Sequence, residues 1–579
     1  MKKALAMILA ICLTAGLCGC NREETPTVTV PTATVHVGNY NEIFSDRDFD
    51  DTYADAKVLE LSGTQTITSA GTYLLQGNLE NGQVIVAAGE QDKVQLVLAG
   101  VSITASGAAP IYIASADKVF ITLAEGTENT LTCTGDFVQT DENNVDAAIF
   151  AKCDLTLNGK GKLQVDCEKG HGIASKDELV FTGGTYHITA AGQGISGKDS
   201  LNIADGDFTI QSGTDGLQSK HDENAEYGNI YIAGGSFHIT AGTDGMDASN
   251  TLAILGGSFT VTTGGGSAAG TQGGNDWGGF PGHGGGYTES TDTGSYKGLK
   301  AAVAVSVSGG SFTLDTQDDA IHSNDTVQIA GGEFTIAAGD DGVHADKLLH
   351  ISDGGMTITK SYEGLESASI SITGGQINLV ASDDGLNAAG GNDGSGTGGP
   401  WGGGDMFASD GSGIVITGGT LVVNASGDGL DSNGTIAISG GCVFVDGPTN
   451  SGNGGMDYAE SATVTGGTVF VLGASGMAQG FSAADGQGAI AGNVNTQAAG
   501  TTITISDEKG NVLASYTSQK QFSHIVVSAP GMEENGTYTL SIGGQTATVT
   551  LDGFLYGSGG GMGPGGMGPG GNRPGGRPR

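Results

Sequence analysis

Apolar and polar residues alternate along most of the chain, in short stretches separated by glycine. In residues 229–250, NIYIAGGSFHITAGTDGMDASN, every second side chain is apolar within each stretch. The residues expected on one side are Ile230, Ile232, Phe237, Ile239, Met246 and Ala248. A period of two is typical of β-strands, so this stretch predicts two strands of about five residues and one of about three. A Gly-Gly pair and an Asp-Gly turn separate the strands.

This pattern repeats along the chain, for example in residues 325–346 and 412–433. The second glycine of the Gly-Gly pair, or its equivalent, falls at 184, 206, 235, 257, 310, 332, 355, 375, 419, 441 and 467, and most steps are 20–23 residues. Insertions at 221–228, 264–296 and 390–411 account for the long steps. One repeat cannot bury its apolar face alone, so the repeats must stack. Three short strands per repeat, glycine corners and no helical segment predict an all-β fold, a single-stranded right-handed parallel β-helix of about 22-residue coils.

The segments around the repeats predict export and a surface anchor. Residues 1–19 have two lysines and an apolar stretch, which is typical of a signal peptide, and Gly19 before Cys20 suits cleavage that leaves Cys20 lipidated. An ordinary signal peptide cut near the same place is the alternative. We expect a lipidated tether over 20–56, the β-helix over 57–495, a small antiparallel β cap over 496–556 and a disordered Gly/Pro-rich tail over 557–579. The predicted localisation is the cell surface, with membrane contact only through the lipid.

Composition narrows the choice of partner. Of the 579 residues, 106 are glycine and 11 are proline, so a collagen-like chain is excluded. The net charge of −40 repels phosphates, and we therefore expect no nucleic-acid partner and no binding to anionic membranes. The oligomeric state stays open.

Equivalent positions of stacked repeats form columns, and two of these columns are rich in oxygen ligands. The corner column, the residue before the Gly of the Asp-Gly turn, contains Asp215, Asp244, Asp319, Asp341, Glu363, Asp384 and Asp428. The outward column, two residues after that Gly, contains Gln218, Asp247, His322, His344, Glu366, Asn387, Asp431 and Asp457. Carboxylates about 5 Å apart repel by about 3 kcal/mol at an effective dielectric of 20. Hard cations relieve such repulsion, so the columns predict Ca²⁺ as a cofactor. Solvated Asp-Gly turns are the alternative for any single residue.

A row of lysines occupies one position in four consecutive repeats. The lysine row consists of Lys152, Lys176, Lys198 and Lys220, at spacings of 24, 22 and 22 residues. It is either a cationic strip that holds the carboxylates of an acidic polysaccharide or a ladder of solvated ion pairs of little energetic value.

The tryptophans and the cysteines each allow two interpretations. Trp277 and Trp401 lie in glycine-rich insertions, where they either stack on sugar rings or pack back on the rod. Cys133 and Cys167 each end a strand-like run and could be neighbours, whereas a role as small buried residues is favoured for them and for Cys153 and Cys442.

Residues 94–221 carry a recognisable order of motifs: KVQLVLAGVSITAS, KVFITLAEG, DAAIFAKCDLTLNGKGKLQV, HGIASKDELVFTGGTYHITA and GTDGLQSK. This order resembles the bacterial carbohydrate-binding domain family of right-handed parallel β-helices, which is similar to polysaccharide lyases in fold. The resemblance extends over about residues 57–495. It implies binding of cellulose or acidic sugars and of Ca²⁺. It also supports sugar-binding roles for Lys176, Lys198 and Lys220. It supports Asp215 and the acidic insertion Asp222, Glu223 and Glu226 as well, and we predict Asp215, Asp222 and Glu223 as metal ligands.

The leading functional prediction is Ca²⁺-dependent binding of a polysaccharide, cellulose or an acidic plant-type glycan, by a surface lipoprotein. A polyuronate lyase is the first alternative, with Lys198 or Lys220 as the base and Ca²⁺ neutralising the carboxylate of the substrate. A structural or adhesive rod without a glycan ligand is the second. Which glycan is bound, and how many Ca²⁺ ions, stays open.

Overall fold

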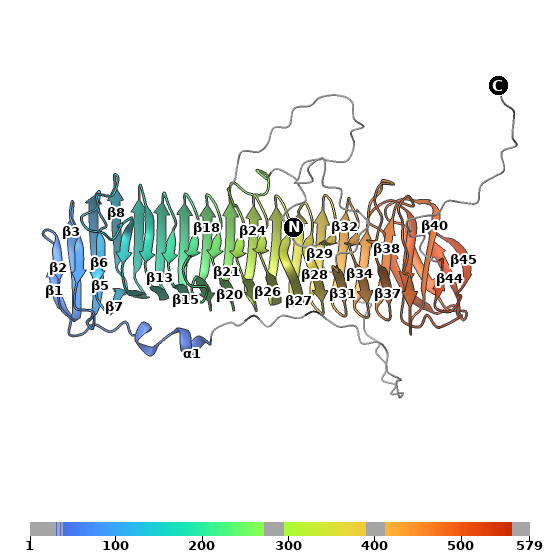
Figure 1. The fold of residues 1–579 in the computed structure, drawn as a ribbon, viewed down its shortest axis with the longest axis horizontal. Coiled ribbons are helices and arrows are strands. Elements are labelled where there is room, and N and C mark those ends of the chain that lie inside the picture. The colour runs from blue at the N-terminus through green and yellow to red at the C-terminus, as the bar shows by residue number, and fades with distance from the viewer. Residues whose placement is uncertain (1–30, 32–34, 36–38, 271–293, 390–410, 558–579) are drawn as a thin grey trace, which may run out of the picture.

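The protein is an elongated rod whose strands lie across its long axis, in a computed structural model that describes residues 31, 35, 39–270, 294–389 and 411–557. β1 (Lys57–Glu60), β2 (Gln65–Ile67) and β3 (Gly71–Leu79) form one end of the rod, and β44 (Thr537–Ile542) and β45 (Gln545–Thr550) lie at the other (Figure 1). The predicted signal peptide, Cys20, Trp277, Trp401 and residues 558–579 of the predicted tail lie outside the described residues.

Three rows of parallel strands follow the length of the rod, and a repeat contributes one strand, or one part of a longer strand, to each row. The first row contains β2, β4 (Val84–Ala87), β6 (Ile111–Ser115), β9 (Ala147–Ala151), β12 (His171–Ser175), β14 (Ile195–Gly197), β16 (Leu217–Ser219), β19 (Met246–Ala248), β22 (Leu299–Ala301), β25 (Ile321–Ser323), β30 (Leu386–Ala388), β33 (Leu430–Ser432) and β36 (Asp457–Tyr458). The second row contains β1, β7 (Lys118–Leu123), β10 (Asp154–Gly159), β17 (Asn229–Ile232), β20 (Thr251–Ile254), β23 (Ala304–Val307), β31 (Gly413–Ile416), β34 (Thr435–Ile438), β37 (Ser461–Val464) and β39 (Ala483–Ala484). The third row contains β8 (Glu128–Thr134), β11 (Lys162–Cys167), β18 (Ser236–Ala241), β21 (Ser258–Thr263), β24 (Ser311–Thr316), β29 (Gln376–Ala381), β32 (Thr420–Ala425), β35 (Cys442–Asp446) and β38 (Thr468–Gly473).

Several strands continue from one row into the next without a break. They are β3, β5 (Lys93–Ser106), β13 (Glu178–Ala190), β15 (Ser200–Ser212), β26 (Thr326–Ala338), β27 (Val343–Lys360) and β28 (Leu365–Ile372). In β15, Gly206 lies at the corner between two rows with φ +144, and a Cβ there would approach the ring of Phe208 to 2.8 Å. A glycine at this corner can take this positive φ, which residues with a side chain rarely adopt, so the strand can turn here without ending.

The core follows from the predicted alternation. Phe208, Phe237, Phe259, Phe312 and Phe334 of the third row are almost fully buried and stack with successive ring centroids 4.9, 4.8, 4.7 and 4.5 Å apart. Aliphatic side chains of the other rows complete this apolar interior. Burial of such a face stabilises each repeat only when a neighbouring repeat covers it.

The predicted fold class is corrected by the sheet topology. We predicted a single-stranded right-handed parallel β-helix of about 22-residue coils with a small C-terminal antiparallel β cap. Instead, 42 strands join in one hydrogen-bonded sheet. Eight of its parallel strands form a closed circuit, and the other strands lie outside this circuit. The order around the circuit is β15, β17, β20, β23, β26, β24, β21, β18 and back to β15. The strands merge because those that continue through the glycine corners join rows that looked separate in the sequence. The fold is all-β and parallel over the repeats, but the predicted single-stranded right-handed parallel β-helix is wrong.

The C-terminal region also differs from the predicted cap. β43 (Phe522–Ser528) pairs antiparallel with β38 and with β40 (Ala489–Gln497), and β46 (Leu555–Tyr556) pairs with β40, so these strands belong to the large sheet. A second antiparallel sheet has the order β42 (Val512–Thr517), β41 (Thr502–Ser506), β44 and β45. Its apolar side packs on Phe470 and Ile525 of the large sheet.

Residues 39–56, within the predicted tether, lie against the side of the rod and are called the strap here. The strap contains helix α1 (Tyr40–Ile43) and a 3-10 turn, η1 (Asp46–Asp48) (Figure 1). Phe44 packs on Tyr231, with ring centroids 5.9 Å apart. The buried carboxylate of Asp48 accepts a hydrogen bond from Thr156 at 2.6 Å and pairs with Lys118 at 3.0 Å. The first part of the strap is therefore held by both apolar and ionic contacts.

Cys133 and Cys167, which we favoured as small buried residues, form a disulfide between the register neighbours β8 and β11. Cys153 is a buried free thiol, and Cys442 is partly buried. Among the described residues, no helix has both the length and the apolar character needed to cross a membrane.

Candidate functional site

The corner column forms as the sequence spacing predicts. The backbone N–H after each column residue donates to the carbonyl oxygen of the next column residue, as from Gly216 to Asp244 at 3.0 Å, Gly342 to Glu363 at 3.0 Å and Gly385 to Asp428 at 2.9 Å. These bonds place the predicted metal-ligating residues Asp215, Asp244, Asp319, Asp341, Glu363, Asp384 and Asp428 at one position of successive repeats, just before the first-row strands.

The outward column lies along the middle of the first-row strands. Its register runs Gln218, Asp247, Lys300, His322, His344, Glu366, Asn387, Asp431 and Asp457. The two columns are three residues apart in each repeat, so a corner side chain can reach its outward neighbour. Asp215, for example, accepts a hydrogen bond from Nε2 of Gln218 at 2.6 Å.

Two lysines that the sequence analysis missed interrupt both columns. Lys297 stands at the corner position between Asp244 and Asp319, and Lys300 at the outward position after Asp247. Residues 297–299 read Lys-Gly-Leu where the other repeats read Asp-Gly-Leu or a close variant. This match could have been found in the sequence, but the insertion before it breaks the regular spacing of the repeats. The structure therefore carries a basic repeat inside an acidic array.

These lysines compensate the carboxylates on both sides of them. Nζ of Lys300 lies 2.8 Å from Oδ2 of Asp244 and 3.4 Å from Asp247. Nζ of Lys297 lies 2.8 Å from Asp318 and 2.9 Å from Asp319. Although burial alone would raise the pKa of Asp319, the charge of Lys297 holds that pKa well below its usual range. Between Asp244 and Asp319, the carboxylates of both columns are thus neutralised by lysines of the protein itself.

The columns beyond Glu363 have no such partner among the ion pairs of the described residues. One carboxylate oxygen each from Asp384, Asp428 and Asp431 lies within 4.8 Å of the others. Burial, together with the charges of Asp457 and Asp383, raises the pKa of Asp428 to about 7. Burial and the charge of Asp428 raise the pKa of Asp431 to about 8. Ionised carboxylates in this acidic cluster therefore need a cation or must bind protons.

An amide oxygen beside the acidic cluster completes a hard donor set. Asn387 is the register neighbour of Asp431, and its Nδ2 donates to both oxygens of Glu363 at 3.0 and 2.9 Å. Oδ1 of Asn387 is buried without a hydrogen-bond partner among the described residues. Carboxylate and amide oxygens at flexible spacing are the ligands that Ca²⁺ takes. Asp384, Asn387, Asp428 and Asp431 therefore fit a Ca²⁺ ion.

The lysine row lies at the other edge of the first-row strands. Lys152, Lys176, Lys198 and Lys220 directly follow β9, β12, β14 and β16, which are successive neighbours in the sheet. Lys152, Lys176 and Lys220 are exposed and Lys198 is half-buried. Nζ of Lys176 lies 5.2 Å from the ring centroid of Phe150, and Nζ of Lys220 lies 3.9 Å from the exposed carboxylate of Asp222. The row is accessible to a ligand.

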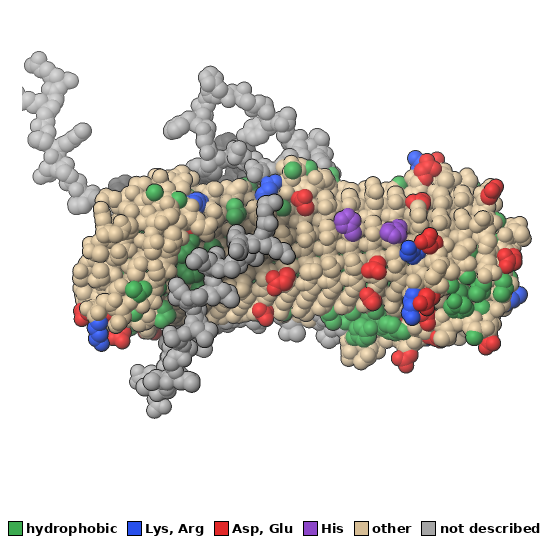
Figure 2. Space-filling view, turned by 180° about the vertical axis from the view of Figure 1, so that it is seen from behind, with side chains coloured by type: hydrophobic (Ala, Val, Ile, Leu, Met, Phe, Trp, Pro, Cys, Tyr) green, Lys and Arg blue, Asp and Glu red, His purple; other side chains and the backbone are tan. Residues whose placement is uncertain are grey.

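The structure separates other predicted site residues from the columns. Asp222 and Glu223 are exposed in the insertion after Lys220, where the backbone N–H of Glu223 bonds to His221 at 3.3 Å. Seen from behind, the rod is mostly uncharged, and its acidic side chains stand as separate spots (Figure 2). The net charge of −40 is thus not displayed as a continuous acidic stripe on that side.

The lysine row and the first corner carboxylates lie in the part of the chain with known relatives. Residues 62–342 match the family model of carbohydrate-binding domain-containing proteins. This match confirms the resemblance seen in the sequence over those residues. A carbohydrate-binding domain-containing protein of Acetivibrio thermocellus is 39% identical over 126 residues, which are 21% of this chain and 44% of the relative, so the chain spans less than half of that relative's length. A solved structure described as the polysaccharide lyase-like protein from C. thermocellum, a gadolinium derivative, is 25% identical, covers 50% of this chain and 94% of its own, and superposes with a TM-score of 0.33.

Proposed function

We propose that this protein binds a polysaccharide along the side of the rod, at the edge formed by the lysine row. The observation that carries the proposal is the placement of four lysines at one position of consecutive repeats, inside the residues that match carbohydrate-binding proteins. Neighbouring strands are about 4.8 Å apart, so the row presents ammonium groups at a regular spacing. A linear chain with a carboxylate on each sugar is the glycan whose charge this row complements, and uncharged cellulose is the alternative ligand.

The proposal includes Ca²⁺ as a cofactor of the rod. Asp384, Asn387, Asp428 and Asp431 would hold the ion, for the reasons of burial, charge and donor type given above. When bound, Ca²⁺ supplies the positive charge that this part of the columns lacks. The lysines in the N-terminal repeats attract the glycan.

Pull-down with insoluble cellulose and with a pectate gel tests the binding. We expect the full chain to be retained on at least one matrix in Ca²⁺ and released by EDTA. The triple variant Lys176→Gln, Lys198→Gln and Lys220→Gln should bind pectate at least about tenfold more weakly, because three charge-assisted contacts are lost. Lys162→Gln is the matched control, since Lys162 is exposed and pairs only with exposed Glu128 among the described residues.

Incubation of the protein with pectate and Ca²⁺ also distinguishes glycan binding from the two alternatives, a lyase and a structural rod. Unsaturated product absorbing in the ultraviolet would identify a polyuronate lyase instead of a binding protein. Failure to bind either matrix in Ca²⁺ would contradict the proposal and favour a structural rod.

We also propose that the protein is exported and held on the cell surface by a lipid on Cys20, as the lipobox-like sequence predicts. Cys20→Ser should release the protein from the membrane fraction, and unchanged membrane association would contradict the anchor.

A further inference from the structure

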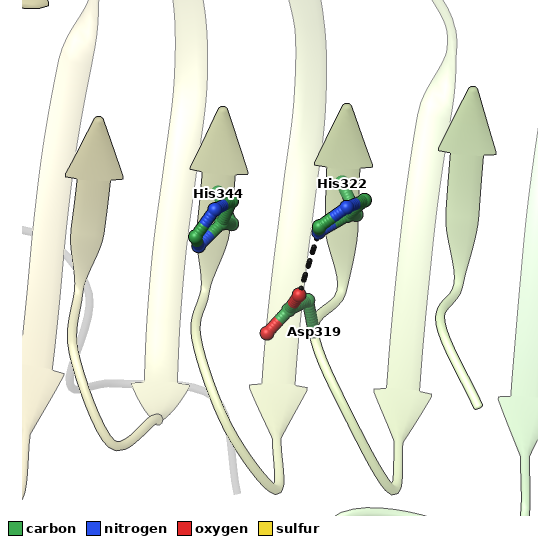
Figure 3. A group of neighbouring side chains, drawn as sticks. All are labelled: Asp319, His322 and His344. Atoms are coloured by element: carbon green, nitrogen blue, oxygen red, sulfur yellow. Dashed lines mark hydrogen bonds and ion pairs between the residues drawn. The ribbon is translucent and has the colours of Figure 1, made fainter. Parts of the chain in front are cut away.

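Two buried histidines lie one behind the other in the outward column. His322 in β25 and His344 in β27 are register neighbours, and they are 5% and 0% exposed. Their ring centroids are 4.9 Å apart and their planes differ by 19°. Figure 3 shows the two rings on adjacent strands, with Asp319 at the corner before the strand that carries His322.

The outer nitrogen of each ring already has a partner. Nε2 of His322 lies 3.0 Å from Oδ1 of Asn324, and Nε2 of His344 lies 3.2 Å from Oδ1 of Asp346. Both partners are oxygen acceptors, so Nε2 carries a proton in each ring. Metal-bound histidines commonly have this arrangement, in which the other ring nitrogen donates to an oxygen that fixes the ring.

The inner nitrogens face carboxylates of the corner and outward columns. Nδ1 of His322 lies 2.9 Å from Oδ2 of Asp319. Nδ1 of His344 lies 2.8 Å from Oε2 of Glu366 and 3.4 Å from Oδ2 of Asp341. Two acceptors cannot stay this close without a cation between them, so each Nδ1 needs either a second proton or a metal ion.

The same contacts suit a divalent ion. The carboxylates of Asp319, Asp341 and Glu366 face the two rings. These carboxylates and both rings are buried. A divalent ion bound here would take the place of the second proton on a ring and leave that ring neutral.

We propose that Asp319, His322 and His344 bind one transition-metal ion of the borderline class, such as Zn²⁺, through the carboxylate and the two Nδ1 atoms. One ligand atom from each of the three lies within 4.8 Å of the others. Zinc ligands at about 2.0–2.1 Å are roughly 3.4 Å apart in a tetrahedron. The separation of 3.4 Å between His344 and Asp341 matches this value, and the 2.9 Å between His322 and Asp319 would widen by about 0.5 Å on metal binding. Asp341 or Glu366, which both contact His344, supplies a carboxylate for the fourth position.

The chemistry of the donors distinguishes this zinc site from the calcium site. Imidazole nitrogen favours zinc and its neighbours in the transition series, whereas Ca²⁺ takes oxygen ligands. The site goes beyond the proposed function, which rests on other residues. A bound ion would tie together two successive repeats near the middle of the rod, and a third repeat where Glu366 supplies the fourth ligand.

Equilibrium dialysis of the untagged, EDTA-stripped full chain against Zn²⁺ tests this proposal. We expect one tightly held zinc per chain, which excess Ca²⁺ does not displace. His322→Gln and His344→Gln should each weaken binding by more than about 100-fold, because each removes a direct ligand. The control His238→Gln, an exposed histidine of β18, should bind as the wild type does, and so should Asp431→Asn.

X-ray absorption at the zinc edge of the wild-type protein gives a test that does not depend on the folding of variants. We expect scattering from about two imidazoles per zinc. The proposal would be overturned if the wild-type protein retained no zinc, or if both histidine variants retained as much zinc as the wild type. Displacement of zinc by an equal concentration of Ca²⁺, or a spectrum with oxygen ligands alone, would overturn it as well.

Discussion

The ammonium nitrogen of Lys300 lies 2.8 Å from Oδ2 of Asp244, which is 3% exposed and belongs to the preceding repeat. Together with Lys297, Lys300 places two positive charges in columns that are otherwise acidic. The columns therefore have two electrostatic regimes: carboxylates near these lysines are neutralised by the protein itself, and those beyond Glu363 depend on protons or on an added cation.

Lys300→Gln tests the first regime. It leaves the buried carboxylate of Asp244 without its cation, and loss of one partner of such a pair costs about 3 kcal/mol. We expect a lower melting temperature in EDTA and partial recovery in Ca²⁺. Lys347→Gln, which removes the exposed partner of Asp325, is the matched control and should melt as the wild type does. Equal melting of the Lys300 and Lys347 variants would contradict the assignment.

Asp428→Asn or Asp431→Asn tests the second regime. Each removes one repelling carboxylate from the acidic cluster, so the variant should melt at a higher temperature than the wild type in EDTA. Each also removes a ligand, so the stabilisation of the wild type by Ca²⁺ should be lost. The exposed control Asp485→Asn should keep the full Ca²⁺ response. A Ca²⁺-induced shift that survives in both cluster variants would place the ion elsewhere.

Asp48→Asn should loosen the strap. The substitution removes the charge that pairs with buried Lys118 at 3.0 Å, at a cost of about 3 kcal/mol. Hydrogen exchange at residues 39–50 should become faster, while exchange in the core strands of the rod stays slow. Asp50→Asn, which changes a half-exposed ion pair with Arg47 and two exposed hydrogen bonds from Thr52 but no contact with Lys118, is the control. If exchange in the strap is unchanged, Asp48 is not what holds it.

Asp154 predicts a pH dependence of stability. Burial, with the charges of Asp177 and Glu178, raises the pKa of Asp154 to about 6. Because this pKa lies above its value in the unfolded chain, folding favours the protonated form. Stability is therefore lost as the pH rises from about 4 through 6.

Asp154→Asn should raise the melting temperature at pH 7.5, with a gain of at most about 3 kcal/mol, and have little effect at pH 4. The exposed control Asp207→Asn should change neither value. An equal effect of Asp154→Asn at both pH values would contradict the shift.

The repeats could be predicted because their physical cause is local. Alternation places Phe237 and Ile239 on the apolar side, and the structure buries both. Position in the repeat also places Asp215 and Asp428 in one column. The joining of rows into one closed sheet could not be predicted. In the sequence Gly206 looks like part of a turn between two strands, but it lies within the continuous strand β15.

The missed parts of the site depend on contacts between distant residues. Lys297 and Lys300 follow an insertion that breaks the spacing, so alignment by period alone skipped their repeat. The strap was assigned to a polar tether, although its Phe44 is an apolar anchor. Only the structure shows that Phe44 meets Tyr231 and that Asp48 meets Lys118.

Calorimetric titration of the Ca²⁺-loaded chain with oligogalacturonates of increasing length tests the central claim most directly. The lysine row spans three steps between strands, about 14 Å in all. The account predicts that affinity rises with oligomer length until the oligomer covers this span and then levels off, and that the triple lysine variant loses this gain. Absence of binding at every length in Ca²⁺, or the same length dependence in the variant, would contradict it.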